Sequence, residues 1–140
     1  MTAPDFLAIA RERQKGTLPD LLGLEWTEGR QGFVRGRMEV QRHHHAPNGF
    51  LHAASVIALA DTACGYGCVA SLPEGAAGFT TIELKSNFLG TARDGAIAVA
   101  ARLVHGGRST QLWDAEVTRE SDGKTIALFR CTQMVLWPKA

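Results

Sequence analysis

The 140-residue sequence lacks the features that mark several large classes of protein. Its three cysteines, an odd number, do not provide a disulfide framework, and we expect a reducing, cytoplasmic location. The formal net charge of +1 comes without a block of Lys or Arg, which argues against nucleic acid as a partner. No run reaches the roughly 18 apolar residues of a membrane span, and residues 1–14 are too mixed in charge for a secretory signal. Small ligands and protein partners remain.

The composition is that of one folded domain. Apolar residues make up 45% of the chain and charged residues 21%, which is too apolar for disorder. A chain of this length buries roughly two-thirds of its unfolded surface in one core. Because the sequence has no internal repeat and no linker, we expect a single domain over residues 1–140.

Patterns along the chain predict two helices and six strands. A short amphipathic helix over residues 3–15 ends at Gly16, and a buried helix runs from Ala53 to Gly67, with Gly65 and Gly67 either closing it or allowing tight packing. Extended runs bounded by turn residues are expected at 24–28, 33–40, 79–89, 96–105, 109–120 and 124–137. Short turns produce antiparallel neighbours. The expected α+β fold is an antiparallel curved sheet of about six strands wrapped around one long central helix.

The buried helix carries a single acid, Asp61, among small and apolar residues. A carboxylate in such a place costs several kcal/mol unless something pairs with it or uses it. At about 1.5 Å per residue, Asp61 lies roughly 12 Å along the axis from the helix start at Ala53. That start offers free N–H groups and a positive dipole end, suited to a carbonyl oxygen that gains charge.

The 12 Å separation prevents Asp61 and the start of its own helix from acting on one carbonyl. If two copies of the helix pack side by side and antiparallel, Asp61 of one chain lies near residues 52–54 of the other. The sequence therefore predicts a homodimer with two equivalent sites across the interface.

Residues 48–61, NGFLHAASVIALAD, resemble the hotdog-fold acyl-CoA thioesterases of the phenylacetate-pathway and 4-hydroxybenzoyl-CoA type. That family's motif reads Asn-Gly-x-x-His-Gly-Gly, with an acid eight residues after the first glycine of the pair. The strand order fits as well, and TTIELKSNFLGTARDG (80–95) is similar to the family's strand near the pantetheine. The resemblance implies hydrolysis of an aryl- or short/medium-chain acyl-CoA, with no cofactor and with a homotetramer as the assembly.

By that resemblance Asp61 is the nucleophile or general base, and the N–H of Ala53 polarises the thioester carbonyl. Asn48 and His52 flank the site. The departure from the family is the pair Ala53 and Ala54 in place of two glycines, which keeps the N–H groups but narrows the approach of the acyl group.

The resemblance also implies residues that bind the CoA portion of the substrate. Asn87, Arg108 and Ser109 are candidates for contacts with pantetheine or phosphate, and an Arg side chain suits phosphate. An exposed Arg in a glycine-rich turn is also an ordinary surface feature.

Each site residue has a structural alternative. Asp61 can be an interior acid satisfied by a hydroxyl, His52 a helix cap, and Asn48 a turn former. Three adjacent histidines, residues 43–45, point to alternating faces when extended and so make a poor metal site. Cys64 and Cys68, one turn apart, are typical of a core.

Other functions of proteins with this fold fit the residues of this sequence less well. A dehydratase of this fold needs a loop His and a Glu fourteen residues later, but Leu59 follows His45 at that spacing. A hydratase needs a His shortly after the Asp, and none follows Asp61. A non-catalytic acyl-CoA sensor would not need Asp61.

Overall fold

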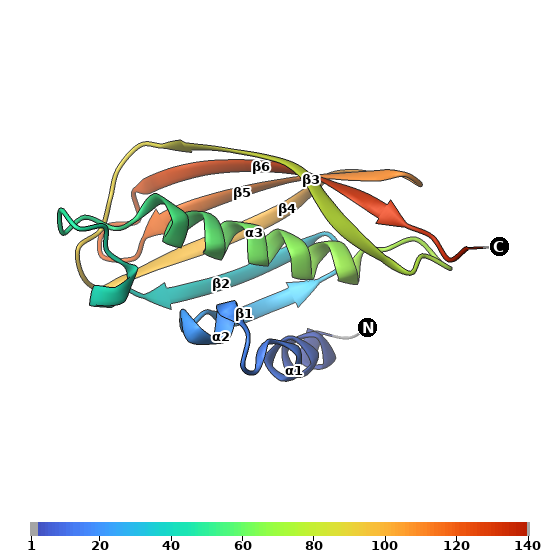
Figure 1. The fold of residues 1–140 in the computed structure, drawn as a ribbon, viewed down its shortest axis with the longest axis horizontal. Helices are drawn as coiled ribbons and strands as arrows, with labels where there is room; N and C mark the ends of the chain where they lie inside the picture. Colours follow the sequence, from blue (N-terminus) through green and yellow to red (C-terminus); the bar gives the residue numbers. More distant parts are fainter. Residues whose placement is uncertain (1–2, 140) are drawn as a thin grey trace.

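The computed structural model describes residues 3–139 and shows one curved sheet with one long helix against its concave face (Figure 1). The helices are α1 (Ala3–Gln14), α2 (Leu18–Leu21) and α3 (Ala53–Ala70), with a 3₁₀ turn, η1, at Arg42–His44. The strands are β1 (Glu25–Arg30), β2 (Phe33–Glu39), β3 (Gly78–Phe88), β4 (Ala96–Gly106), β5 (Thr110–Arg119) and β6 (Thr125–Leu136).

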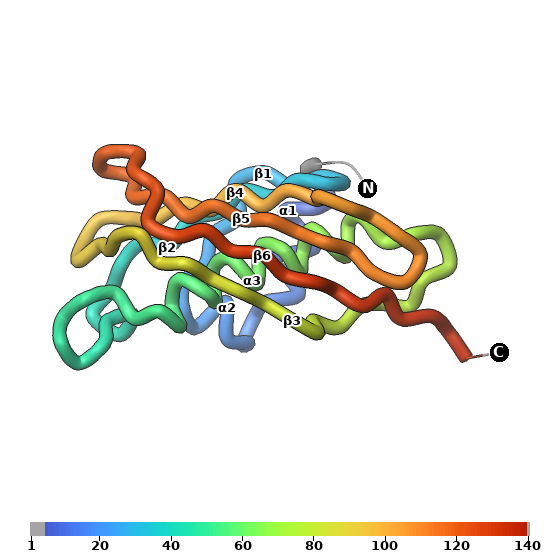
Figure 2. Tube along the Cα trace, turned by 90° about the horizontal axis from the view of Figure 1, so that it is seen from above, coloured from blue at the N-terminus to red at the C-terminus, as the bar shows by residue number. Residues whose placement is uncertain are grey.

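The six strands are all antiparallel and lie in the order β1-β2-β4-β5-β6-β3. Seen from above, β3 lies outside β6 at one margin of the sheet (Figure 2). The chain crosses from β2 to β3 by way of α3, so the first hairpin and β3 occupy opposite edges. The predicted α+β architecture of six curved strands and one central helix is confirmed.

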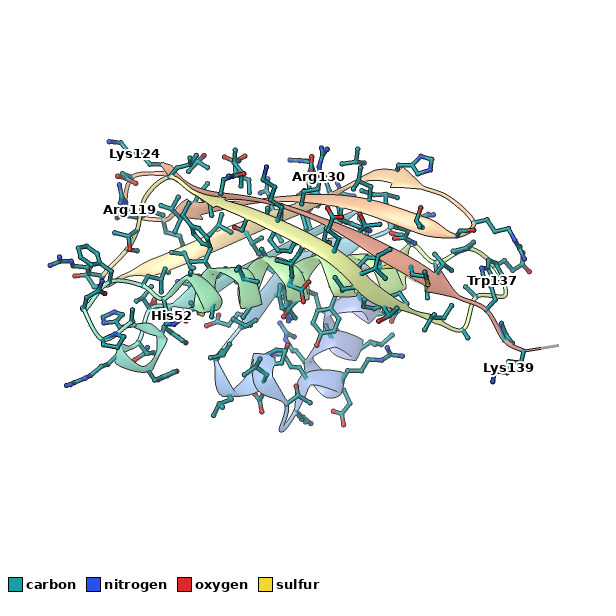
Figure 3. All side chains as sticks on the ribbon, turned by 45° about the horizontal axis from the view of Figure 1, so that its top comes forward. His52, Arg119, Lys124, Arg130, Trp137 and Lys139 are labelled. Carbon is teal, nitrogen blue, oxygen red and sulfur yellow. The ribbon has the colours of Figure 1, made fainter. Side chains whose placement is uncertain are left out.

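The sheet turns its alternate residues toward α3 because successive strand side chains point to opposite faces. Val99, Trp113 and Phe129 lie on that inner face and are buried against Leu59 and other α3 side chains. The opposite, convex face carries charged side chains, among them Arg130, which Figure 3 shows on the side of the sheet away from α3. The core therefore sits between one face of the sheet and one side of α3.

Helix α3 is longer than expected from the sequence, because it passes through both glycines and ends at Ala70. A Cβ atom on Gly67 would lie 2.4 Å from the indole of Trp113, and one on Gly65 would lie 3.3 Å from the Phe79 ring. These glycines therefore permit close packing rather than end the helix.

Helix α3 bears on the expectation about membrane spans, although Asp61 interrupts its apolar residues. With 18 residues, it is long and apolar enough to cross a membrane by length and composition. A helix that packs in a protein core passes the same test, and one side of α3 is buried against the sheet.

Two further boundaries differ from the sequence-based expectation. Gly29 lies inside β1 rather than in the turn. The Phe6 ring occupies the space that a Cβ atom at this position would need, which explains a glycine within the strand. The expected loop over residues 41–49 contains η1, and its buried His44 side chain accepts a hydrogen bond from the Gln41 N–H.

Candidate active site

Asp61 lies in the middle of α3 and borders a cavity of about 280 Å³. Its Oδ1 atom is buried and has no hydrogen-bond partner among the described residues. Burial raises the pKa of Asp61 above its ordinary value of 3.8. A buried carboxylate oxygen without a partner is costly, so this group is available to a ligand or to a second chain.

The walls of the cavity come from three separate parts of the chain. Helix α3 contributes Tyr66, the start of β3 contributes Phe79 and Thr81, and the C-terminal turn of α1 contributes Arg13. The walls are mainly apolar, and the two rings provide most of the bulk. Such a cavity suits an acyl group next to the carboxylate of Asp61.

The Tyr66 ring is held rigidly. It makes edge contacts with the rings of Phe6 and Trp26, at centroid distances of 6.2 and 5.3 Å. Its hydroxyl lies 3.2 Å from both the carbonyl oxygen of Ala10 and Oε1 of Gln14. This wall of the cavity is therefore fixed by α1 and β1.

The start of α3 presents exposed donors at the other end of the same helix surface. His52 is the N-cap, and its Nδ1 atom accepts a hydrogen bond of 2.8 Å from the N–H of Ala54. This bond places the ring proton on Nε2, where it can be donated to a ligand. Ala53 and Ala54 are exposed, and within residues 3–139 no partner is found for the Ala53 N–H.

Asn48 lies in the loop before α3. Its Oδ1 atom accepts a hydrogen bond of 3.1 Å from the Phe50 N–H, which is the turn role considered from the sequence. The amide nitrogen of this exposed side chain remains able to donate. Asn48 precedes His52 and Ala53 by only four and five residues, and Figure 3 shows His52 at one end of the molecule. A common role of these three residues in the site stays a prediction.

A single chain does not bring these donors to Asp61. Eight residues of helix separate Ala53 from Asp61, about 12 Å along the axis. The catalytic residues expected from the sequence therefore form two groups in the monomer, the carboxylate with its cavity and the donors at the helix start.

The predicted CoA contacts lie in two further places. Asn87 is on the convex face of the sheet, where it borders a depression together with Lys85 and Arg130. Arg108 stacks on the Trp137 ring, 4.2 Å from guanidinium carbon to ring centroid, and its carbonyl oxygen accepts a bond from the Trp137 indole. Ser109 adjoins it and accepts a backbone bond from Val135. Their roles in binding CoA stay predictions.

The three adjacent histidines and the three cysteines make contacts typical of a folded core or loop rather than of a metal or redox site. The rings of His43 and His44 are 4.2 Å apart, while His45 contacts the carbonyl oxygen of Arg93. Among residues 3–139 no three His, Cys, Asp or Glu side chains gather as metal ligands. Cys64, Cys68 and Cys131 are free and buried, and the nearby Cys131 together with burial raises the pKa of Cys64.

Comparison with known proteins identifies the family. The thioesterase superfamily matches residues 48–126, which include the start of α3, Asp61 and most of the sheet. This chain belongs to that superfamily. It is 30% identical to the 1,4-dihydroxy-2-naphthoyl-CoA hydrolase of Listeria monocytogenes over 115 residues, covering 82% of this chain and 92% of that protein.

Solved structures agree with the assignment. A mutant of the thioesterase PA1618 from Pseudomonas aeruginosa has a TM-score of 0.87 and 28% identity, covering 93% of each chain. The PaaI protein from the phenylacetic acid degradation operon of Escherichia coli shares the fold at a TM-score of 0.84 and 22% identity, covering 97% of this chain and 96% of that one. The predicted hotdog fold and thioesterase resemblance are confirmed.

As a member of this superfamily, the enzyme is a thioester hydrolase that acts on acyl-CoA substrates. Sequence reasoning found Asp61 and the donors at the helix start, but missed Arg13, Tyr66, Phe79 and Thr81 as cavity walls. Tyr66 could have been found, since it follows Asp61 by little more than one helical turn. Arg13 gave no signal, because only the folded chain brings α1 beside α3.

Proposed function

We propose that two copies of this thioesterase pair through β3 and share two equivalent active sites, each with Asp61 from one chain and the start of α3 from the other. The observation that carries the proposal is the buried, partnerless Oδ1 of Asp61 beside an apolar cavity, on a helix whose free N–H donors lie about 12 Å away. Only a second, antiparallel α3 supplies such donors to this carboxylate.

The bare edge of the sheet supports this pairing. Three large apolar side chains of β3 are exposed in the single chain: Ile82 at 53%, Leu84 at 41% and Phe88 at 45%. An exposed apolar edge strand is a template for another strand, and proteins rarely leave one open. Antiparallel pairing of two β3 strands would extend the sheet and set the two α3 helices side by side in opposite directions.

In such a site the N–H of Ala53 and the Nε2–H of His52 stabilise the thioester oxygen as it gains negative charge. Asp61 either removes a proton from a water that attacks the carbonyl carbon, or attacks that carbon itself to give a mixed anhydride that water then opens. In both routes the carbon–sulfur bond breaks, the CoA thiolate leaves and takes up a proton, and water supplies the oxygen of the free acid.

The acyl group is an aryl or a short to medium chain, because the cavity next to Asp61 has two aromatic walls and a limited volume. Asn48 donates its amide to the substrate carbonyl or to the attacking water. Asn87, Arg108 and Ser109 hold the CoA portion. A homotetramer and a cytoplasmic location are further parts of this proposal.

Thiol release from a panel of acyl-CoAs tests the role of Asp61. We expect Asp61→Asn to lower kcat about 10²- to 10⁴-fold, the range of a lost general base, while Asp122→Asn in the exposed turn between β5 and β6 leaves kcat unchanged. Because the base must be ionised, activity should fall with decreasing pH through a pKa above 3.8. Binding of acyl-CoA without thiol release by the wild type would instead favour a sensor.

Mixing two inactive variants tests whether the site is shared. Ala53→Pro removes one N–H at the first helical position, where proline is tolerated and where His52 already has the extended backbone that proline requires. Unfolded and refolded together with Asp61→Asn, it should restore about a quarter of wild-type activity, since half the dimers are mixed and each holds one intact site. No recovery would place both groups within one chain.

A further inference from the structure

Arg13 is the charged residue at the acyl cavity that the proposed chemistry does not use. It comes from the last turn of α1 and lines the same cavity as Asp61, Tyr66 and Phe79. Within residues 3–139 its guanidinium has no ion pair with an Asp or Glu side chain. An arginine without a partner at the rim of an apolar cavity is available to an acidic oxygen of the ligand.

Arg13 and Asp61 lie toward opposite ends of the cavity. Tyr66 stands about 7.5 Å further along the α3 axis than Asp61. The positive charge of Arg13 opposes the rise that burial causes in the pKa of Tyr66. The raised pKa of Asp61 has burial as its cause. Arg13 also borders a smaller depression that Tyr66, Val69 and Ala70 line and Asp61 does not. The cation is therefore nearer the Tyr66 end of the cavity, and the carboxylate marks the reacting end.

The α1 helix that carries Arg13 is firmly attached to the rest of the fold. The buried Gln14 side chain donates to the Leu24 carbonyl oxygen at 2.8 Å and accepts from the Trp26 indole at 2.8 Å. Phe6 fills the space above Gly29 on β1. The backbone of the adjacent Arg13 is thus held on a fixed wall, and its exposed side chain extends from that wall to the rim of the cavity.

We propose that Arg13 determines acyl specificity by binding an acidic or hydroxyl oxygen at the far end of the acyl group, with the apolar part of that group between Tyr66 and Phe79. This inference deepens the proposed function and rests on it. The ligand chemistry is an acyl-CoA with an apolar body and a terminal acidic oxygen. Both a hydroxylated aryl ring and a chain that ends in a carboxylate have that chemistry.

Two matched pairs of substrates distinguish a hydroxylated aryl group from a chain that ends in a carboxylate. The aryl pair is benzoyl-CoA and 4-hydroxybenzoyl-CoA, and the aliphatic pair is hexanoyl-CoA and adipoyl-CoA. For the wild type we expect kcat/KM about tenfold higher for the oxygen-bearing member of at least one pair, the size of one charge-assisted hydrogen bond. The pair that shows the preference identifies the source.

Variants on α1 then assign the preference to Arg13. Arg13→Leu should raise the KM of the preferred substrate about tenfold with little change in kcat, and should leave its unsubstituted partner within about twofold. Arg13→Lys should retain part of the preference. The control is Arg11→Leu, which removes the same charge from the same helix but borders a different depression, near Leu24; it should change nothing.

The outcomes separate this inference from the proposed function. Turnover of all four substrates without preference, or an equal loss for both members of a pair in Arg13→Leu, would overturn the role of Arg13 and leave the hydrolase intact. Failure of the wild type to release thiol from any of the four would overturn both.

Discussion

The two edges of the sheet differ in what covers them. At the β1 edge the chain covers itself, because α1 packs on β1 through Phe6 and Gln14, and Arg37 on the neighbouring β2 is bound to Glu120 at 3.0 Å. At the β3 edge no other strand of residues 3–139 lies outside β3, and Ile82 and Phe88 are exposed. Both edges belong to one sheet with the same kind of strand pairing.

This difference indicates where the second chain belongs. A sheet edge is open to association unless it is covered or charged. Helix α1 packs against β1, and β1 itself carries Glu25, Glu28 and Arg30, which disfavour the addition of another strand at that edge. The acyl cavity opens beside the strand that stays bare, since Phe79 and Thr81 of β3 are in its wall. The β1 edge thus stabilises the fold, and in the proposed dimer the open edge serves catalysis.

A charge on the open edge should have the largest effect. Ile82→Lys on β3 should weaken the dimer and reduce activity at low enzyme concentration about 100-fold, because a site shared by two chains is lost when they separate. Analytical ultracentrifugation and activity against enzyme concentration measure both. Thr27→Lys on the exposed side of β1 is the matched control, and an equal loss there would erase the distinction between the edges.

Substitutions where α1 packs on β1 should lower the stability of the fold. Gln14→Leu leaves the Trp26 indole N–H and the Leu24 carbonyl without partners, so we expect unfolding free energy to fall by about 2–3 kcal/mol. Urea denaturation gives the value. The neighbouring Glu12→Gln, which removes only an exposed pair with Lys15, should leave the unfolding free energy close to that of the wild type. A dimer that dissociates in Gln14→Leu while its fold persists would contradict the division of roles.

Two glycines sharpen the same contrast. A Cβ atom on Gly36 would lie 2.4 Å from the Trp26 ring and 2.7 Å from the Glu25 carbonyl oxygen, so Gly36→Ala should destabilise by about 1–3 kcal/mol. Gly78 at the start of β3 has open space around it, and Gly78→Ala should be close to neutral. Thermal unfolding of both variants, compared at one protein concentration, tests this difference.

The smallest effect should be a dependence of stability on pH from His44. Its Nε2–H donates to the Leu22 carbonyl oxygen at 2.8 Å, while Nδ1 accepts from Gln41, so the folded state holds a neutral ring. Burial is the main cause that lowers its pKa below 6.5. The unfolded chain therefore binds more protons as pH falls below 6.5, and stability should decline in that window. In His44→Gln this part of the slope in denaturation midpoint against pH should disappear.

Much of the fold could be predicted from the sequence because its signals are local. Turn residues such as Ser121-Asp122-Gly123 separate the strands, and the change from extended to helical pattern marks the start of α3 at Ala53. The end of α3 could not be predicted from local sequence. Gly65 and Gly67 are required inside the helix because Phe79 and Trp113, which are distant in sequence, pack closely against them.

The candidate site divides in the same way. Asp61 stands out locally as the single acid of an apolar helix, and His52 and Ala53 follow from the helix start. Arg13 and Phe79 carry no such local signal, because their place at the cavity depends on how α1 and β3 pack around α3. The pairing of Asp61 with a second helix start is a prediction from the roughly 12 Å between Ala53 and Asp61, and the mixed variants test it.

Helix α3 has no acidic residue in its first turn and no basic residue in its last turn, so both of its ends keep their partial charges. In one chain alone this arrangement is mildly unfavourable, since a helix is steadied by charges that oppose its dipole. Two such helices lying alongside each other in opposite directions attract, because each positive end then faces a negative one. The uncompensated ends of α3 thus slightly destabilise an isolated chain, and the proposed antiparallel pairing of two helices removes that cost.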